Sequence, residues 1–400
     1  MPVLLTPECH NTLQKKAGFK LFYLALLLLS FHWSMVVYVN STYLEQFVSA
    51  KTVGVLYVCG TLFTVLAFLH ATPLLSRFGN RQLTIFLTIL EIAALLGMAF
   101  SESLLIVVPL FILHQAIVPL ILFTLDIFME DMIGKHEEST GERRGLFLTI
   151  TSLMGALASL GTGNLLGAGV PNFTIVYLLS AAILFPFLLI IINRFRGFSD
   201  PHYPSFEIIA GIKSFWKYKD VRNVFCAHFL LQLFFAFMVI YVPVYLSTVL
   251  HYNWEQIGQI LFVGLMAYVC FEYLVGYVAD VFIGEKEMMA FGFAIMAVSI
   301  SWLVFLDSDT VLAWMIAMFI ARVGASLVET TTESYFFKHT QSKDANVIGL
   351  FRITQPLAYM TGAGLGVVVL AFLPYELLFV VLGFCMVPGL FFAMALHDTK

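Results

Sequence analysis

The chain alternates between long apolar runs and short segments that contain polar residues, glycine or proline. A helix needs about 20 mostly apolar residues to cross a bilayer. Twelve runs reach that length, near residues 20–40, 52–72, 82–101, 104–130, 145–168, 173–193, 222–249, 255–279, 287–306, 310–335, 346–371 and 375–396. The pattern therefore predicts an all-α membrane protein with twelve transmembrane helices.

The composition supports the membrane class. Of 400 residues, 60% are hydrophobic and 12% are charged, whereas soluble domains have about 45–50% apolar and about 25% charged residues. The net charge of -4 gives no reason to expect a nucleic-acid partner. The five cysteines are scattered without a C-x-x-C spacing, so we interpret them as small core residues. The first apolar run, from Phe22, lacks a small-residue cleavage site and is interpreted as a retained span.

The basic residues predict the orientation of these spans, because short cytoplasmic loops carry an excess of Lys and Arg. With the N-terminus inside, eighteen of the 21 basic residues fall on the cytoplasmic side and only Lys51 falls outside. The other two, Arg322 and Arg352, fall within spans. We therefore expect a multi-pass protein of the plasma (inner) membrane with both termini in the cytoplasm.

The second half of the chain repeats features of the first half. The phrase MVVYV at Met35 returns as MVIYV at Met238, 203 residues later. The pairs at the same offset, to within one residue, are Gly54 and Gly60 with Gly258 and Gly264, Asp126 and Glu130 with Glu329 and Glu333, and GLF at Gly145 with GLF at Gly349. Six spans per half return the chain to the same side, so the pattern predicts two bundles related by a parallel two-fold repeat along the membrane normal.

The repeat divides the chain into five parts. We predict a cytoplasmic tail at 1–17, a six-helix bundle at 18–195, a cytoplasmic linker at 196–220, a second bundle at 221–396 and a cytoplasmic C-terminus at 397–400. In the linker, apolar residues at spacings of three and four predict an interfacial amphipathic helix, with a simple tethering loop as the alternative. The apolar residues are Phe206, Ile209, Ile212 and Trp216.

Small residues on the predicted span 145–168 follow one face. Gly155, Ser159, Gly163 and Gly167 are spaced at intervals of four. Such a stripe lets another helix approach closely. The counterpart span carries Gly362, Gly364 and Gly366.

Two corresponding loops carry a recognisable signature. TPLLSRFGNRQL and GYVADVFIGEK resemble the G-x-x-x-D-R-x-G-R-R loop motif of the major facilitator superfamily. The residues that match it are Arg77, Gly79 and Arg81 in the first loop, and Gly276, Asp280, Gly284 and Lys286 in the second, where Gly284 comes one residue late. Thr72 and Ser76 stand where the first copy should have glycine and aspartate. The resemblance covers nearly the whole chain and implies the same fold as the repeat.

In that family the basic loop residues meet carboxylates and steady the outward-facing state, so the resemblance implies a gate at the cytoplasmic end. Asp126 and Glu130 are at the right end of their span to receive Arg77 or Arg81. We interpret both acids as gate or structural residues, with direct substrate contact as the alternative.

The second half predicts its own ion pair. Arg352 and Glu329 are each about seven residues from the cytoplasmic end of adjacent spans, hence roughly 10 Å deep. A lone arginine at that depth is costly. We expect Arg352 to pair with Glu329 or Glu333, and Glu272 lies at a similar depth as a further gate or coupling candidate. Glu272, like Glu91, could carry a proton or bind a neighbouring hydroxyl.

Arg322 is the main candidate for substrate binding. It lies about eleven residues into its span, or roughly 16 Å deep, where a charge costs at least about 2.5–3.5 kcal/mol. In the family the first, fourth, seventh and tenth helices line the cavity, so an arginine here suits an anionic or polyhydroxylated ligand. A purely structural arginine, neutralised by an acid, is the alternative. Residues that could add hydrogen bonds in the cavity, or be packed polar residues, are His32, Trp33, His114, Gln115 and Gln232.

The predicted function is secondary transport of a small organic solute by alternating access, coupled to protons or another ion, with export slightly favoured. The main alternative is uptake of a sugar or organic anion, and a transporter-like receptor or assembly protein is an alternative from another class. The sequence contains no P-loop, G-x-S-x-G or H-E-x-x-H motif, so we expect neither a nucleotide cofactor, a metal nor an enzyme. The expected partners are the solute, the coupling ion and the lipid bilayer, and the chain is expected to act as a monomer.

The topology can be tested by labelling single introduced cysteines with a membrane-impermeant reagent. The sorting of basic residues predicts labelling from outside near Ser101, Asn172, Asp307 and Pro374. Cysteines near Glu138 and Ser342 should be protected in intact cells. Reversed labelling of either set would exclude the predicted orientation.

Overall fold

The computed structural model describes residues 7–133, 140–200, 203, 219–279, 284–306, 310–339 and 345–397, and this part of the chain contains helices and no strands. The first half contains α1 (Pro7–Val37), α2 (Asn40–Glu45), α3 (Ala50–Leu69), α4 (Ala71–Phe78), α5 (Asn80–Phe100), α6 (Leu104–Ile133), α7 (Thr140–Leu166) and α8 (Phe173–Arg194). The second half contains α10 (Lys219–Ile240), α11 (Val242–Val244), the π-helical turn η2 (Tyr245–Val249), α12 (Trp254–Val278), α13 (Glu285–Trp302), the 3-10 turn η4 (Leu303–Phe305), α14 (Val311–His339), α15 (Ala345–Phe372) and α16 (Leu377–Met394). The predicted amphipathic helix of the linker lies outside the described residues.

Eleven helices of the described chain are long and apolar enough to cross a membrane. They correspond to the predicted spans except 145–168, which is α7. With 27 residues α7 is also long enough to cross. The all-α membrane fold is confirmed, and the small residues of α7 serve helix packing, as described below.

The repeated phrase marks a break in the first long helix of each half. After α1 the chain turns at Val39, with φ -91° and ψ -33°, and continues as α2. After α10 it turns at Tyr241, with φ -103° and ψ -32°, and continues as α11 and η2. The two halves therefore repeat this bend as well as the sequence that forms it.

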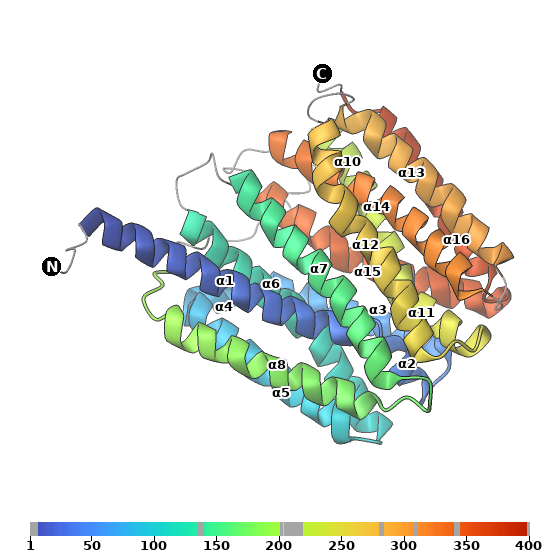
Figure 1. Cartoon of the computed structure of the whole chain (residues 1–400), viewed down its shortest axis with the longest axis horizontal. Helices are drawn as coiled ribbons and strands as arrows, with labels where there is room; N and C mark the ends of the chain where they lie inside the picture. Colours follow the sequence, from blue (N-terminus) through green and yellow to red (C-terminus); the bar gives the residue numbers. More distant parts are fainter. Residues whose placement is uncertain are drawn as a thin grey trace.

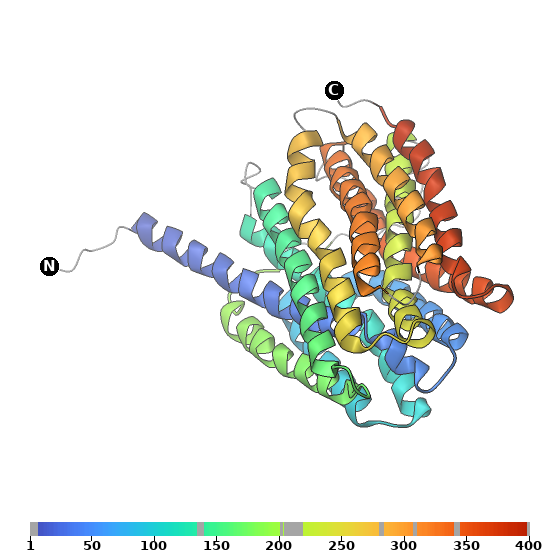
Figure 2. The same cartoon turned by 45° about the vertical axis from the view of Figure 1, so that its right-hand side comes forward.

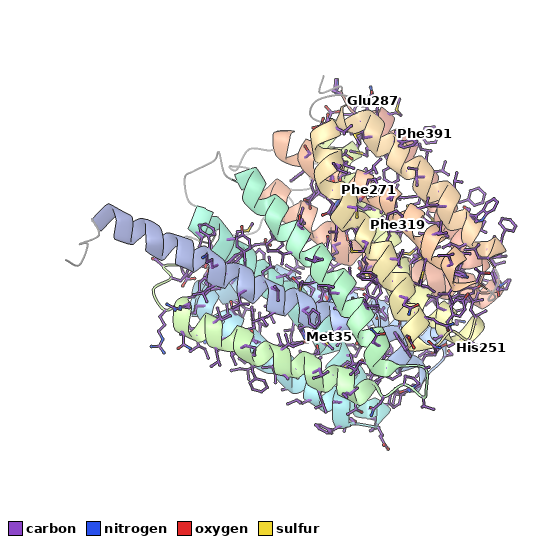
Figure 3. The ribbon with its side chains drawn as sticks, viewed as in Figure 1. Met35, His251, Phe271, Glu287, Phe319 and Phe391 are labelled. Carbon is purple, nitrogen blue, oxygen red and sulfur yellow. The ribbon has the colours of Figure 1, made fainter. Side chains whose placement is uncertain are left out.

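The two halves form separate bundles that contact each other through α7 with α12 and α3 with α15. In both views the blue-to-green helices and the yellow-to-red helices diverge toward the end where both termini lie, which we call the termini end (Figures 1 and 2). They come together at the opposite end, near α2 and α11, which we call the far end (Figure 1). The side chains that fill each bundle are drawn in Figure 3, where Phe271 of α12 lies near Phe319 of α14. These two rings pack edge to face, with centroids 6.2 Å apart.

Glycines allow α7 and α12 to meet backbone to backbone at the far end. A Cβ atom added to Gly258 would lie 2.7 Å from the Cα atom of Gly163 and 2.8 Å from the carbonyl oxygen of Ser159. Helices in lipid associate through such close van der Waals packing, because lipid tails are as apolar as the helices themselves. The small-residue stripe of α7 thus provides one contact between the halves.

A second contact joins α3 to α15. A Cβ atom added to Gly54 would lie 2.6 Å from the Tyr241 hydroxyl oxygen and 2.6 Å from Cγ2 of Val367, while one added to Gly366 would collide with the Tyr241 ring. The Tyr241 hydroxyl donates a hydrogen bond to the carbonyl oxygen of Ala363 at 2.7 Å. Gly54 and Gly258 are counterparts in the repeat, and each lies where the two halves meet.

Replacing Gly258 with alanine should part the halves at the far end, because backbone atoms of α7 occupy the space of the new methyl group. Overpacking costs about 1–3 kcal/mol. Amide hydrogen exchange should therefore rise roughly tenfold or more in residues 159–166 and 254–260. Gly161→Ala on α7 is the matched control, since its added Cβ atom meets nothing within 4 Å. Equal exchange in the two variants would contradict the close packing.

Candidate substrate-binding cavity

A cavity of about 470 Å³ lies between the two halves. Residues of α1, α3, α6 and α7 line it on one side, and residues of α10, α12, α14 and α15 line it on the other. It extends from Asn40 and Tyr57 down to Met129 and Phe351, toward the termini end of the helices. A volume between about 300 and 1,000 Å³ is typical of sites for small organic ligands.

The structure brings most of the predicted substrate-binding residues to this cavity. They are Trp33, His114, Gln115, Gln232 and Arg322. Three of the predicted gate or coupling acids also line it: Asp126, Glu329 and Glu333. His32 is fully buried in the first half, behind the cavity wall, where its ring is 2.6 Å from Ser180 Oγ.

The Arg322 guanidinium group lies in the cavity wall without a partner. Its side chain is 1% exposed, and both Nη1 and Nη2 lack a hydrogen-bond partner. Space for the group comes from Gly264 of α12, where an added Cβ atom would collide with Nη1. The site therefore presents buried positive charge with unused hydrogen-bond donors.

The first half contains the counterpart of this arrangement. Gly60, which corresponds to Gly264 in the repeat, lies against Gln115 of α6, with its added Cβ atom 3.2 Å from the Gln115 side chain. In both halves a glycine on the second long helix makes room for a long polar side chain on the fourth. The second glycine pair of the repeat thus shapes the cavity, whereas the first pair joins the halves.

Three carboxylates of the second half lie on the same side of the cavity as Arg322. Glu272 of α12 accepts a hydrogen bond at 3.3 Å from Ser152 Oγ of α7, which links the two halves, while its Oε2 atom lacks a partner. Glu329 and Glu333 lie one turn apart on α14 and line the cavity. The backbone of Arg352 lies in α15, but its side chain is outside the described residues, so its ion pair stays a prediction.

The two arginines of the first-half loop have other contacts in this conformation. Arg77 is exposed and lies over the ring of its neighbour Phe78, 5.2 Å from the centroid. Arg81 Nη2 instead donates to the carbonyl oxygen of Ile192, near the end of α8, at 2.7 Å. The side chain of Glu130 lies outside the described residues, so the pairing of Asp126 or Glu130 with these arginines stays a prediction.

The loop signature has the same backbone form in both halves. Gly79 has φ +80° and Gly284 has φ +100°, and each immediately precedes a long helix, α5 or α13. Positive φ is readily adopted by glycine, which explains why the motif requires it. Of the other residues that match the motif in the second loop, Gly276 lies within α12. Lys286 Nζ is 3.8 Å from Glu287 Oε1, and Asp280 is outside the described residues.

Asp200 is a loop residue that the sequence did not point to. Its Oδ1 atom accepts hydrogen bonds from the backbone N–H of Asn80 at 2.6 Å and from the Tyr203 hydroxyl at 2.5 Å. It therefore caps the first turn of α5, which begins four residues after Ser76, where the motif has lost its acid. The missing acid at Ser76 was the only sign in the sequence that another acid caps this helix. It did not identify Asp200, which is 120 positions away from Asn80.

The comparisons with known proteins agree with this architecture. The family model for the Major Facilitator Superfamily matches residues 22–354 and 224–400. A solved structure of the nucleoside transporter NupG is similar, with a TM-score of 0.74 over 94% of this chain and 99% of that chain, at 11% sequence identity. No curated protein matches this sequence. The chain therefore belongs to the major facilitator superfamily, a family of multi-pass membrane transporters and not of enzymes.

Proposed function

We propose that this chain is a secondary active transporter that binds a small polar organic solute at Arg322 and carries it across the membrane by alternating access. The observation that carries the proposal is the buried Arg322 guanidinium, whose Nη atoms have no partner in the described structure. A buried charge of this kind is costly until an anion or several hydroxyl groups bind it. A solute that supplies those groups therefore gains binding energy at this position.

The other lining residues favour a solute with a ring or several hydroxyl groups. Gln115, Gln232 and Gln355 offer amide groups, which both donate and accept hydrogen bonds. Aromatic side chains that could stack on a ring surround them: Trp33, Tyr38, Phe235, Tyr268 and Tyr359. Organic anions, sugars and nucleosides all fit this chemistry, and NupG, the solved structure reported above, is a nucleoside transporter.

The proposed orientation places the termini end in the cytoplasm, following the distribution of Lys and Arg. In this orientation the two halves are in contact on the outer side, and the residues that line the cavity extend toward the cytoplasmic side. This arrangement is typical of an inward-facing state. Opening the far end while closing the termini end would complete the cycle. We propose that a proton gradient drives transport and that the direction is export. Uptake is the alternative, and transport assays with the gradient reversed would reveal it.

Loss of the Arg322 guanidinium should abolish solute binding without unfolding the protein. A panel of monocarboxylates, hexoses and nucleosides can be screened by thermal shift on purified protein, since ligands raise the apparent stability of the folded state. For any hit, Arg322→Ala should weaken binding at least about tenfold, because a hydrogen bond to a charged group contributes about 1.5–3 kcal/mol. Arg322→Lys should recover binding only in part, since it lacks the planar fork.

Gly264→Ala provides a second test that keeps the charge. Its methyl group would displace the guanidinium, so solute binding should fall although the arginine remains. The controls are Arg196→Ala, which removes an exposed arginine, and Gly276→Ala, whose added Cβ atom meets only Thr330 Cγ2 at 3.6 Å. Full binding by folded Arg322→Ala protein would rule out this site. Binding without counterflow in proteoliposomes would favour the receptor alternative.

A further inference from the structure

Three titratable side chains of the first half meet beside the cavity. His32 of α1, Glu91 of α5 and His114 of α6 are 0%, 0% and 2% exposed. Glu91 Oε1 lies 2.5 Å from His114 Nδ1 and 3.5 Å from His32 Nε2, whereas Glu91 Oε2 has no partner. One carboxylate oxygen thus faces two imidazole rings in a water-poor part of the bundle.

The hydrogen bonds around His114 fix its tautomer. The Tyr177 hydroxyl donates to Asn40 Oδ1 at 2.8 Å, so the amide nitrogen of Asn40 points toward His114. That nitrogen donates to His114 Nε2 at 3.1 Å, and Nε2 therefore carries no proton. The proton of His114 is on Nδ1, where it is donated to Glu91.

A similar argument leaves the facing atom of His32 in need of a proton. The Ser180 hydroxyl donates to the carbonyl oxygen of His32 at 3.1 Å, so it must accept from the Nδ1–H group of His32 at 2.6 Å. In a neutral His32 ring Nε2 would then carry a lone pair and no proton. This lone pair would face Glu91 Oε1, and two hydrogen-bond acceptors that face each other repel. A proton between these two atoms removes the repulsion and neutralises the buried carboxylate.

We propose that His32, Glu91 and His114 form a buried site that binds one proton and exchanges it with the cavity through His114. We place the bound proton on His32 Nε2, which makes no hydrogen bond in the described structure and lies 3.5 Å from Glu91 Oε1. With it the site has no net charge, and without it the site leaves one uncompensated negative charge inside the membrane, which is costly. The site deepens the proposed function by identifying the coupling ion, although proton binding itself requires no assumption about the solute.

Asn40 controls the path from the cavity to this site. It is the first residue of α2, directly after the break at Val39, and both Asn40 and His114 line the cavity. When the Asn40 amide turns over, its oxygen faces His114 Nε2, which can then take a proton from the cavity. The Nδ1 proton of His114 passes to Glu91 Oε1 and on to His32 Nε2, while His114 keeps the new proton on Nε2, facing the oxygen of Asn40. The site as a whole gains one proton and no electrons move.

The other titratable groups around the site are phenols. Tyr177 of α8 binds Asn40, and Tyr43 of α2 packs against Tyr177 with ring centroids 4.9 Å apart. Tyr57 of α3 lines the cavity near by, and its hydroxyl has no partner. Phenols are neutral across the physiological pH range, so they do not replace the proton. No group of three or more His, Cys, Asp or Glu side chains in the described residues could hold a metal ion.

The bound proton can be detected directly in purified protein with nitrogen-15 labelled histidine. At pH 8 exposed histidines, with an ordinary pKa of about 6.5, are neutral. The wild-type protein should nevertheless show one imidazolium NMR signal if the proton is on His32, or one protonated-carboxyl infrared band if it is on Glu91. Either signal should be lost in the Glu91→Gln variant. The signal should persist in His70→Gln, which removes an exposed histidine. Absence of both signals from wild type at pH 8 would overturn the proposal, whatever the variants do.

The exchange path gives a second test, with two variants that should act in opposite directions. Tyr177→Phe removes the hydrogen bond that holds the Asn40 amide, so deuterium from the solvent should reach the site faster than in wild type. Asn40→Leu removes the polar group on the path and should slow the exchange. Equal rates, or a change in the same direction in both variants, would exclude Asn40 as the control point. Neither readout needs a solute, so failure of the transport proposal would be seen separately.

Discussion

The contact between the two halves at the far end is the constraint on which the rest of the structure depends. In lipid, burial of apolar side chains provides little force between helices, so two bundles hold together through close packing and hydrogen bonds between helices. At the far end Gly163 and Gly258 meet backbone to backbone, and Gly54 lies against the Tyr241 side chain. The halves diverge from there toward the termini end (Figure 2). The cavity lies between them, and residues of both halves line it.

The two walls of the cavity differ in their electrostatics. The second half contributes the unpaired guanidinium of Arg322, and the first half contributes His114, which belongs to the network around Glu91. Under our proposals one half binds the polar or anionic solute and the other binds the proton. Both sites lie close to elements that must move between states, since Asn40 follows the break after α1 and Gly264 lies on α12, which contacts α7. Occupancy of either site can therefore bias the equilibrium between conformations.

The sequence predicted the architecture well because the repeat and the hydropathy are properties of the chain itself. The phrases at Met35 and Met238 end at the corresponding breaks, and the glycine pairs found by their offset have corresponding positions in the two halves. The sequence also predicted a span at 145–168, and the structure contains the 27-residue helix α7 there.

The hydrogen-bond partners could not be predicted in the same way. Asp200 caps α5 from 120 residues away, and Ser180 binds His32 from 148 residues away. Such contacts depend on how helices are rotated and packed, which leaves no periodic trace in the sequence. The hydrogen bond from Arg81 to the carbonyl oxygen of Ile192, at the end of α8, was not predicted for the same reason.

Paired distances at the two ends of the molecule would test the rocking of the halves most directly. Spin labels at Glu102 and Thr310 report on the far end, and labels at Gly197 and Glu287 report on the termini end. When pH or a bound solute shifts the conformational equilibrium, alternating access predicts that one distance lengthens while the other shortens. Distances that lengthen together, or that change at one end alone, would contradict the account.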